Sequence, residues 1–188
     1  MRQHPGAVTI NQEIVTMTIK AQRKTIKFCP SVDVEGFLLP DGEFRVGKSS
    51  ASLALGYQKD YLSRLPKKSE KQFKALLGEG YADSPVSVEV DIERGSVRSE
   101  TISLNDFEAF IFFSAYRGKK EAIAIQRAIT RTGLEDWFRL SFGQQQLTLE
   151  EKRDRFYKSY AATINWLEED RKGWRVIEEQ EMFLLSMS

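Results

Sequence analysis

The sequence predicts an α+β fold, in which a small antiparallel sheet and a β-hairpin pack with several short helices and one long C-terminal helix. Apolar and polar side chains alternate along parts of the first half of the chain, which is the period of half-buried strands. Further along, apolar residues recur at the three- and four-residue spacing of helices. With 188 residues, 41% of them hydrophobic, the chain is long enough to bury a core of its own.

The strands are expected in two groups. Residues 14–29 predict two short strands and a turn, and the tripeptide Pro40-Asp41-Gly42 predicts a turn between two further strands. The hairpin is expected later, where valine and isoleucine alternate with polar residues on both sides of a turn at residues 93–96. The further strands of both groups are predicted at residues 35–39, 43–46, 86–92 and 97–102.

Three short helices are expected between residues 49 and 78. The first two, at residues 49–55 and 59–65, with a turn at Gly56-Tyr57 between them, have the scale of a helix-turn-helix unit. Ser49 or Ser50 can cap the first helix, which Gly56 ends in the left-handed conformation common at helix ends. The second helix is predicted to end before Pro66, because proline lacks the backbone N–H that a helix needs.

Capping residues predict where the other helices begin. Ser69 with Gln72, and Thr148 with Glu151, have the three-residue spacing of a capping box. The helix that starts at Thr148 is expected to be long and to end at Gly173. A further helix is predicted after Ser103 or Asn105, and another over residues 119–132, with more apolar residues following Gly133. Residues 174–188 are predicted to form an apolar tail.

We place a domain boundary at the glutamine run after Gly143. Residues 1–143 are expected to form the α+β unit, and residues 144–188 a helical extension. The extension carries an apolar stripe, and this stripe and the apolar tail together exceed what one helix can bury alone, so we expect a homo-oligomer. The residues of this stripe are Phe156, Tyr160, Ile164 and Leu167.

Composition excludes several classes of function. A single cysteine, Cys29, and a single histidine, His4, allow no internal disulfide, no structural zinc site and no histidine-based catalytic triad. We therefore expect no cofactor and no catalytic residue. The sequence has no apolar run of the roughly 20 residues needed to span a bilayer and no secretory signal. We expect a cytoplasmic protein.

Positive charge concentrates in the region of the short helices. The net charge of the chain is only +1, but residues 43–81 hold eight basic against four acidic residues, a net charge of +4. A helix-turn-helix-like unit in a basic segment predicts contacts with duplex DNA. The candidates are Lys48, Gln58, Lys59, Tyr61, Ser63 and Arg64, with Lys67, Lys68, Lys71 and Lys74 for the phosphates and Arg117, Lys119 and Lys120 as a second phosphate contact.

Two stretches of sequence carry a family resemblance. The segments "GEFRVGKSSASLALGYQKDYLSRL" and "ISLNDFEAFIFFSAYRGKKEAIAIQRAITRTGLEDWF" resemble the Bro-N and KilA-N-type domains of phages, large DNA viruses and bacterial mobile elements. The resemblance covers residues 35–142. It implies DNA binding, usually regulatory, and no catalysis.

Other functions stay open. The segment "GEFRVGKS" matches the spacing of a phosphate-binding loop, although bulky residues occupy positions where that loop uses small ones. Glu89, Asp91 and Glu93 alternate along the hairpin and would share one face, so a metal-dependent nuclease is an alternative. A protein-interaction module that uses the apolar tail is the other alternative.

Overall fold

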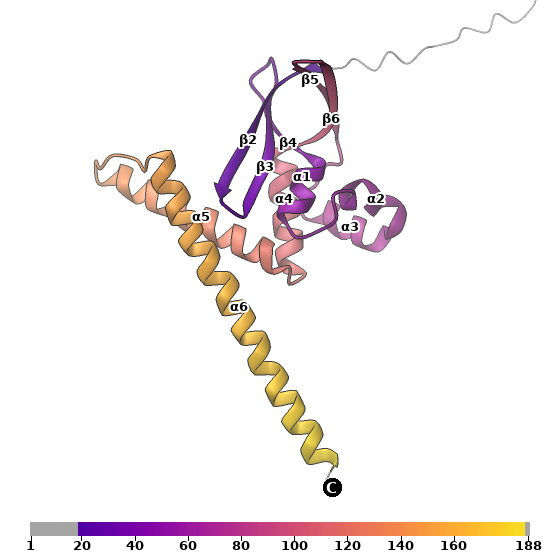
Figure 1. Cartoon of the computed structure of the whole chain (residues 1–188), viewed down its shortest axis with the longest axis vertical. Coiled ribbons are helices and arrows are strands. Elements are labelled where there is room, and N and C mark those ends of the chain that lie inside the picture. Colours follow the sequence, from indigo (N-terminus) through magenta and orange to yellow (C-terminus); the bar gives the residue numbers. More distant parts are fainter. Residues whose placement is uncertain (1–18, 187–188) are drawn as a thin grey trace, which may run out of the picture.

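The computed structural model describes residues 19–186, with all side chains except those of residues 173–181 and 183–186. Within these residues the chain forms one six-stranded sheet and six helices (Figure 1). The predicted α+β class is confirmed. The strands are β1 (Ile19–Lys20), β2 (Gln22–Cys29), β3 (Val32–Leu38), β4 (Phe44–Gly47), β5 (Val86–Ile92) and β6 (Gly95–Ser103).

The hairpin and the N-terminal strands belong to a single mixed sheet, with the order β1-β5-β6-β4-β3-β2. The hairpin β5–β6 joins the other strands because β6 pairs antiparallel with β4, with Val46 opposite Ile102. The two-residue strand β1 adds one parallel pair at the edge beside β5. The sheet is therefore larger than the small antiparallel sheet that alternation predicted. The predicted strand residues 14–18 lie outside the described residues.

The helices are α1 (Lys48–Ala54), α2 (Tyr61–Lys68), α3 (Glu70–Gly78), α4 (Leu104–Tyr116), α5 (Lys120–Ser141) and α6 (Leu149–Ser186). The main core lies between the sheet and helices α1, α4 and α5, with Leu55, Ile102, Phe110 and Ile125 almost fully buried. A second, smaller cluster of buried side chains includes Phe37 of β3 and Val88 of β5. Neither α2 nor α3 covers the sheet, and both stand at the side of the molecule (Figure 1).

The start of α1 differs from the prediction. Its N-cap is Gly47, and no side chain caps it. Instead, the Ser50 hydroxyl donates to the Gly47 carbonyl at 2.9 Å and accepts from the Glu35 backbone N–H at 3.0 Å. Ser50 thus connects α1 to strand β3 by a hydrogen bond between residues 15 positions apart. Capping rules consider only neighbouring residues, so they could not predict this bond. The predicted helix end at Gly56 is confirmed, since Gly56 has φ +75°.

Helix α2 continues through Pro66 to Lys68, so the predicted end before Pro66 is wrong. A proline inside a helix removes one backbone hydrogen bond and crowds the preceding turn, at a cost of about 3 kcal/mol. Leu62 and Leu65 are both buried in the core just before this proline. Their burial offsets that cost and holds the last turn in helical form.

The capping predictions at the later helices are largely confirmed. Ser69 accepts from the Gln72 N–H, and Ser103 accepts from the Asp106 N–H. At the start of α6 the capping box is complete, because the Thr148 N–H also donates to the Glu151 carboxylate at 2.8 Å. This bond lowers the pKa of the Glu151 carboxyl.

Two glycines were expected to interrupt helices and do not. Helix α5 runs unbroken through Gly133, and α6 runs through Gly173 for a total of 38 residues. A single glycine in a helix interior lowers stability by only about 1 kcal/mol relative to alanine. The helical turns on either side are enough to offset this cost. None of the helices within the described residues is long and apolar enough to cross a membrane.

The apolar stripe of α6 packs in part on the chain's own body. Phe156 is 4% exposed and its ring stacks on Phe28 of β2, with 5.3 Å between centroids. Tyr160 stacks against Phe156 and also packs on the core. Phe156 is therefore buried by its own chain and is not available as the predicted oligomer contact, whereas Tyr160 is half-buried. Ile164 and Leu167 are half-buried, and the predicted tail lies mostly outside the described side chains.

Replacing Phe156 by alanine is expected to lower the free energy of unfolding by about 3–5 kcal/mol, because a large buried ring is removed and a cavity is left. Tyr157→Ala, one position away and about half exposed, is the matched control and should change it by less than about 1 kcal/mol. Urea denaturation followed by circular dichroism measures both. Equal effects of the two variants would contradict the packing of α6 on β2.

Candidate nucleic-acid interface

Helices α2 and α3 carry the main set of predicted DNA contacts, and their outward side is here called the α2–α3 surface. Leu62 and Leu65 of α2 and Leu76 of α3 are buried against the core. Because these apolar positions face inward, the polar residues between them face solvent. The α2–α3 surface consists of eight exposed residues: Gln58, Lys59, Ser63, Arg64, Lys67, Lys68, Lys71 and Lys74.

A polar cleft of about 470 Å³ lies between the two helices on this surface. Arg64 and Lys68 line it from α2, and Gln72 lines it from α3. A single residue, Ser69, separates α2 from α3, and its extended backbone turns the chain there. Ser69 also lines the cleft. The cleft has hydrogen-bond donors, an amide and positive charge within one concave surface.

Ion pairs occupy two of the basic residues. The Arg64 guanidinium lies 2.7 Å from Asp60, and the Lys74 amine lies 2.7 Å from Glu70, both at the i,i+4 spacing. Among the side chains that the structure describes, the amines of the four other lysines of the surface have no carboxylate within 4.0 Å. These four lysines are Lys59, Lys67, Lys68 and Lys71. They give the α2–α3 surface its excess of positive charge.

An aromatic stack connects this surface to the core. The rings of Tyr57 and Tyr61 lie 3.9 Å apart between centroids, and both stack on Phe110 of α4. Burial raises the pKa of Tyr61 to about 12, so its hydroxyl stays protonated and donates to Gln72 Oε1 at 3.3 Å. Tyr61 therefore fixes the wall of the cleft and is only half-exposed to a ligand.

The loop between α4 and α5 reaches the same stack. The Lys119 amine donates to the Gly56 carbonyl at 3.0 Å and lies 4.3 Å from the Tyr57 ring centroid. The neighbouring Arg117 is exposed, with its guanidinium 5.4 Å from the Phe113 ring centroid. The structure thus brings Arg117 and Lys119 close to the base of α2, although Lys119 already binds the chain's own backbone.

Two predicted contacts lie elsewhere. Lys48 is 8% exposed, and its amine faces Glu100 of β6 at 3.8 Å. The Lys120 amine pairs with Glu168 of α6 at 2.8 Å, and this carboxylate raises the lysine pKa. Both lysines are bound by acids distant in sequence, so they do not belong to the α2–α3 surface.

The segment that matches a phosphate-binding loop does not have the geometry of one. Such a loop follows a strand of a parallel sheet and opens a long helix. Here β4 pairs antiparallel with both of its neighbours, and α1 has only seven residues. The buried Lys48 amine is also turned to Glu100, so it does not point out of the loop.

The acidic residues of the hairpin do not form a metal site. Asp91 binds the amine of Lys20 at 2.9 Å, and Glu89 accepts a hydrogen bond from Ser96. Glu93 lies in the turn after β5. Within residues 19–186, no three histidine, cysteine, aspartate or glutamate side chains are grouped so that they could hold a metal ion. The geometry gives no support to the nuclease alternative.

Sequence reasoning missed two residues that shape the cleft. Gln72 was identified only as a capping partner, yet its amide accepts from Tyr61 and lines the cleft. Asp60 was not considered, although it neutralises Arg64. The four-residue spacing of Asp60 and Arg64 is a signal that could have predicted this pair. A search of protein-family models, of curated proteins and of solved structures found no match for this chain.

Lys119 is expected to support the fold, in contrast to the lysines of the α2–α3 surface. Lys119→Met keeps the aliphatic stem but loses the charged hydrogen bond to Gly56 and the interaction with Tyr57, so it should lower the free energy of unfolding by about 1–2 kcal/mol. Lys71→Met, the control, should change it by less than about 0.5 kcal/mol. Thermal and urea denaturation test this, and a neutral Lys119→Met would show that the loop is not anchored there.

Proposed function

We propose that this chain binds duplex DNA through the α2–α3 surface and acts as a non-catalytic regulator. The observation that carries the proposal is a group of four exposed lysines on and beside two short helices at the side of the molecule (Figure 1). None of the four is in an ion pair with a side chain that the structure describes, and one of them, Lys68, lines the polar cleft. The proposal includes a cytoplasmic location, where the DNA of bacteria and phages is accessible.

The dimensions of α2 support this proposal. A helix with its side chains is about 10–12 Å across, which suits the DNA major groove, about 12 Å wide, and the eight residues of α2 give about 12 Å of length along the groove. Its outward residues Ser63 and Arg64, with Gln58 just before the helix, are side chains that can hydrogen-bond base edges. Lys67, Lys68 and Lys71 surround these residues and suit contacts with phosphates, which position a protein without reading sequence.

The electrostatics support a local mode of binding. The whole chain has a net charge of only +1, so the long-range attraction of the molecule to DNA is weak. Affinity must then come from the few lysines that reach phosphates. Non-specific binding is expected to be weak at physiological salt and to strengthen steeply as salt is removed, because each phosphate contact releases counterions.

Charge removal on the α2–α3 surface is expected to weaken DNA binding. Fluorescence anisotropy with random duplex DNA over a salt series should give a slope of log affinity against log salt of about −0.9 per phosphate contact. In a variant with Lys59, Lys67, Lys68 and Lys71 changed to glutamine, the slope should become shallower by about 0.9 for each phosphate that the variant no longer neutralises.

The matched control removes four exposed basic residues from α5 and α6 by changing Arg131, Lys158, Arg171 and Lys172 to glutamine. It has the same net charge as the first variant. If both variants bound DNA equally weakly, binding would follow net charge and not the α2–α3 surface. If the unchanged protein failed to bind DNA at low salt, the proposed function would be wrong.

Freeing Arg64 is expected to strengthen binding. Asp60→Asn removes the carboxylate that lies 2.7 Å from the Arg64 guanidinium and makes the cleft more positive. The affinity for duplex DNA at low salt should rise on the order of 3- to 10-fold, as for one added phosphate contact. Asp154→Asn breaks the equivalent 2.7 Å pair with Lys158 on α6 and should leave affinity unchanged. A rise in both variants would contradict this role of the cleft.

A further inference from the structure

A second hollow lies on the other side of the molecule, and we call it the α5–α6 groove. It has a volume of about 310 Å³ and lies between α5, the first turns of α6 and strand β2. Ile26, Ile129 and Leu149 form apolar walls that remain exposed to solvent, and Leu149 is 64% exposed. The groove is lined on its polar side mainly by Lys27, Lys152 and Arg153, with Asp136 bound to Lys152.

Gly133 keeps the α5–α6 groove open. It lines the groove in the middle of α5, and a Cβ atom placed on it would meet no atom within 4 Å. Its backbone is helical, so the conformation does not require glycine. A side chain at this position would therefore start in open space at the lining of the groove.

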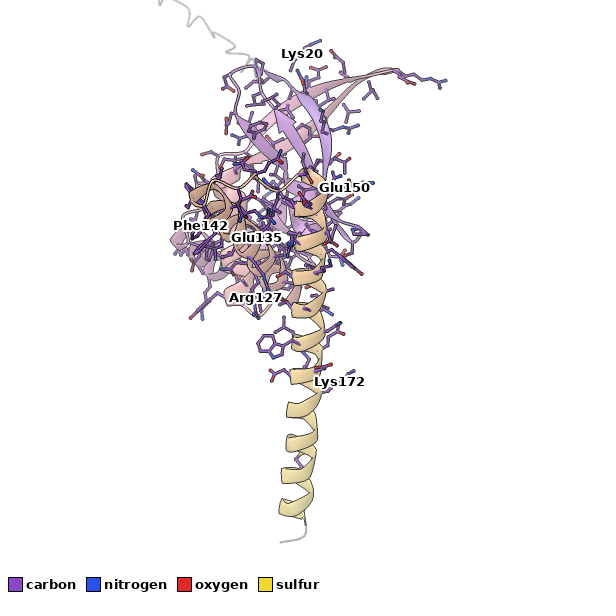
Figure 2. All side chains as sticks on the ribbon, turned by 90° about the vertical axis from the view of Figure 1, so that its left-hand side faces the viewer. Lys20, Arg127, Glu135, Phe142, Glu150 and Lys172 are labelled. Atoms are coloured by element: carbon purple, nitrogen blue, oxygen red, sulfur yellow. The ribbon has the colours of Figure 1, made fainter. Side chains whose placement is uncertain are left out.

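Helix α6 is much longer than the body it packs on. Helix α5 runs antiparallel to α6 and packs on it as far as the ion pair between Lys120 of α5 and Glu168 of α6. Close to this pair, the guanidinium of Arg127 lies over the ring of Trp166. The helix then continues to Ser186, so its last 18 residues extend for about 27 Å. Figure 1 shows this part running away from the molecule, and Figure 2 shows Lys172 already beyond Arg127.

The end of α6 has a composition that matches the α5–α6 groove. Residues 178–185 contain three glutamates followed by four large apolar residues, Met182, Phe183, Leu184 and Leu185. The Met182 side chain is 70% exposed. A helix that carries acidic and apolar residues is complementary to an apolar groove with basic residues at its edge.

The end of α6 cannot reach the groove of its own chain. The groove is lined by Leu149 and Lys152 at the first turns of α6, and Met182 lies 30 residues beyond Lys152 on one unbroken helix. That separation is about 45 Å along the helix axis. Another copy of the chain has no such restriction.

We propose that the last turns of α6 from a second copy of this chain lie in the α5–α6 groove. Each copy has one groove and one helix end, so two copies exchange their helix ends and form a closed two-fold pair. The two α6 helices would run antiparallel, with Arg153 of each copy beside Glu181 of the other copy. In this register the midpoint of the pair falls at Leu167. Leu167 of the predicted oligomer stripe would then lie at the two-fold axis.

Sedimentation equilibrium of the full chain tests the proposal and does not depend on DNA binding. The expected species is a dimer of about twice the 21.6 kDa chain mass. Gly133→Leu should fill the groove and raise the dimer dissociation constant at least about 10-fold, while circular dichroism shows the fold retained. Ala75→Leu, which adds the same side chain on an exposed position of α3, should leave the dimer unchanged.

A charge exchange tests the register. Arg153→Glu and Glu181→Arg should each weaken the dimer at least about 10-fold, and the two together should restore most of the original affinity, because the ion pair is reformed with opposite signs. A monomer at all concentrations would overturn the proposal, as would a dimer that neither Gly133→Leu nor Arg153→Glu weakens. The variant with four glutamines on the α2–α3 surface should remain a dimer, so failure of the two proposals is distinguishable.

Discussion

The pairing of β4 with β6 is the contact on which the rest of the structure depends. It joins the N-terminal strands to the hairpin, and the buried Arg45 reinforces it by donating to Thr101 Oγ1 at 3.0 Å and to the Ser84 carbonyl at 3.0 Å. Helix α1 begins directly after β4, and α4 directly after β6. This short ladder therefore positions the two helices between which the core and the base of the α2–α3 surface are built.

The α2–α3 surface is rigid at its base and polar at its exposed side. Tyr57, Tyr61 and Phe110 form a continuous stack from the core to the cleft, and Lys119 closes it from the α4–α5 loop. Aromatic side chains in such a stack contribute large buried area with few free rotations. The stack therefore holds the start of α2 against the core, while the lysine side chains of the surface remain exposed.

Local signals in the sequence predicted much of the fold, and the errors concern long-range contacts. The caps at Ser69 and Thr148 depend on residues three positions away, so spacing alone located them, whereas the sequence left Ser103 and Asn105 both open as the cap of α4. The helix through Pro66 depends on burial of Leu62 and Leu65, which local rules cannot weigh. Alternation also could not show that the hairpin and the first strands share one sheet, because strand pairing across 56 residues leaves no local pattern.

The candidate site was predictable to a similar extent. The four lysines of α2 and α3 that the sequence offered as phosphate contacts are all exposed. Lys48 and Lys120 could not be assigned, because their acidic partners Glu100 and Glu168 are about 50 residues away in sequence. The apolar stripe of α6 misled in the same way. Its period shows that Phe156 is buried, but not whether Phe28 of the same chain or a second copy buries it.

The two proposals together assign separate roles to the two ends of the molecule. A two-fold axis near Leu167 lies 18 residues from Leu149, so in a pair the starts of the two α6 helices are about 54 Å apart along the helices. In such a pair the length of α6 would set how far apart the bodies of the two copies lie, whereas the side chains of α2 and α3 would set what each surface recognises. A shorter α6 would change the spacing and leave the recognition of each site unaltered.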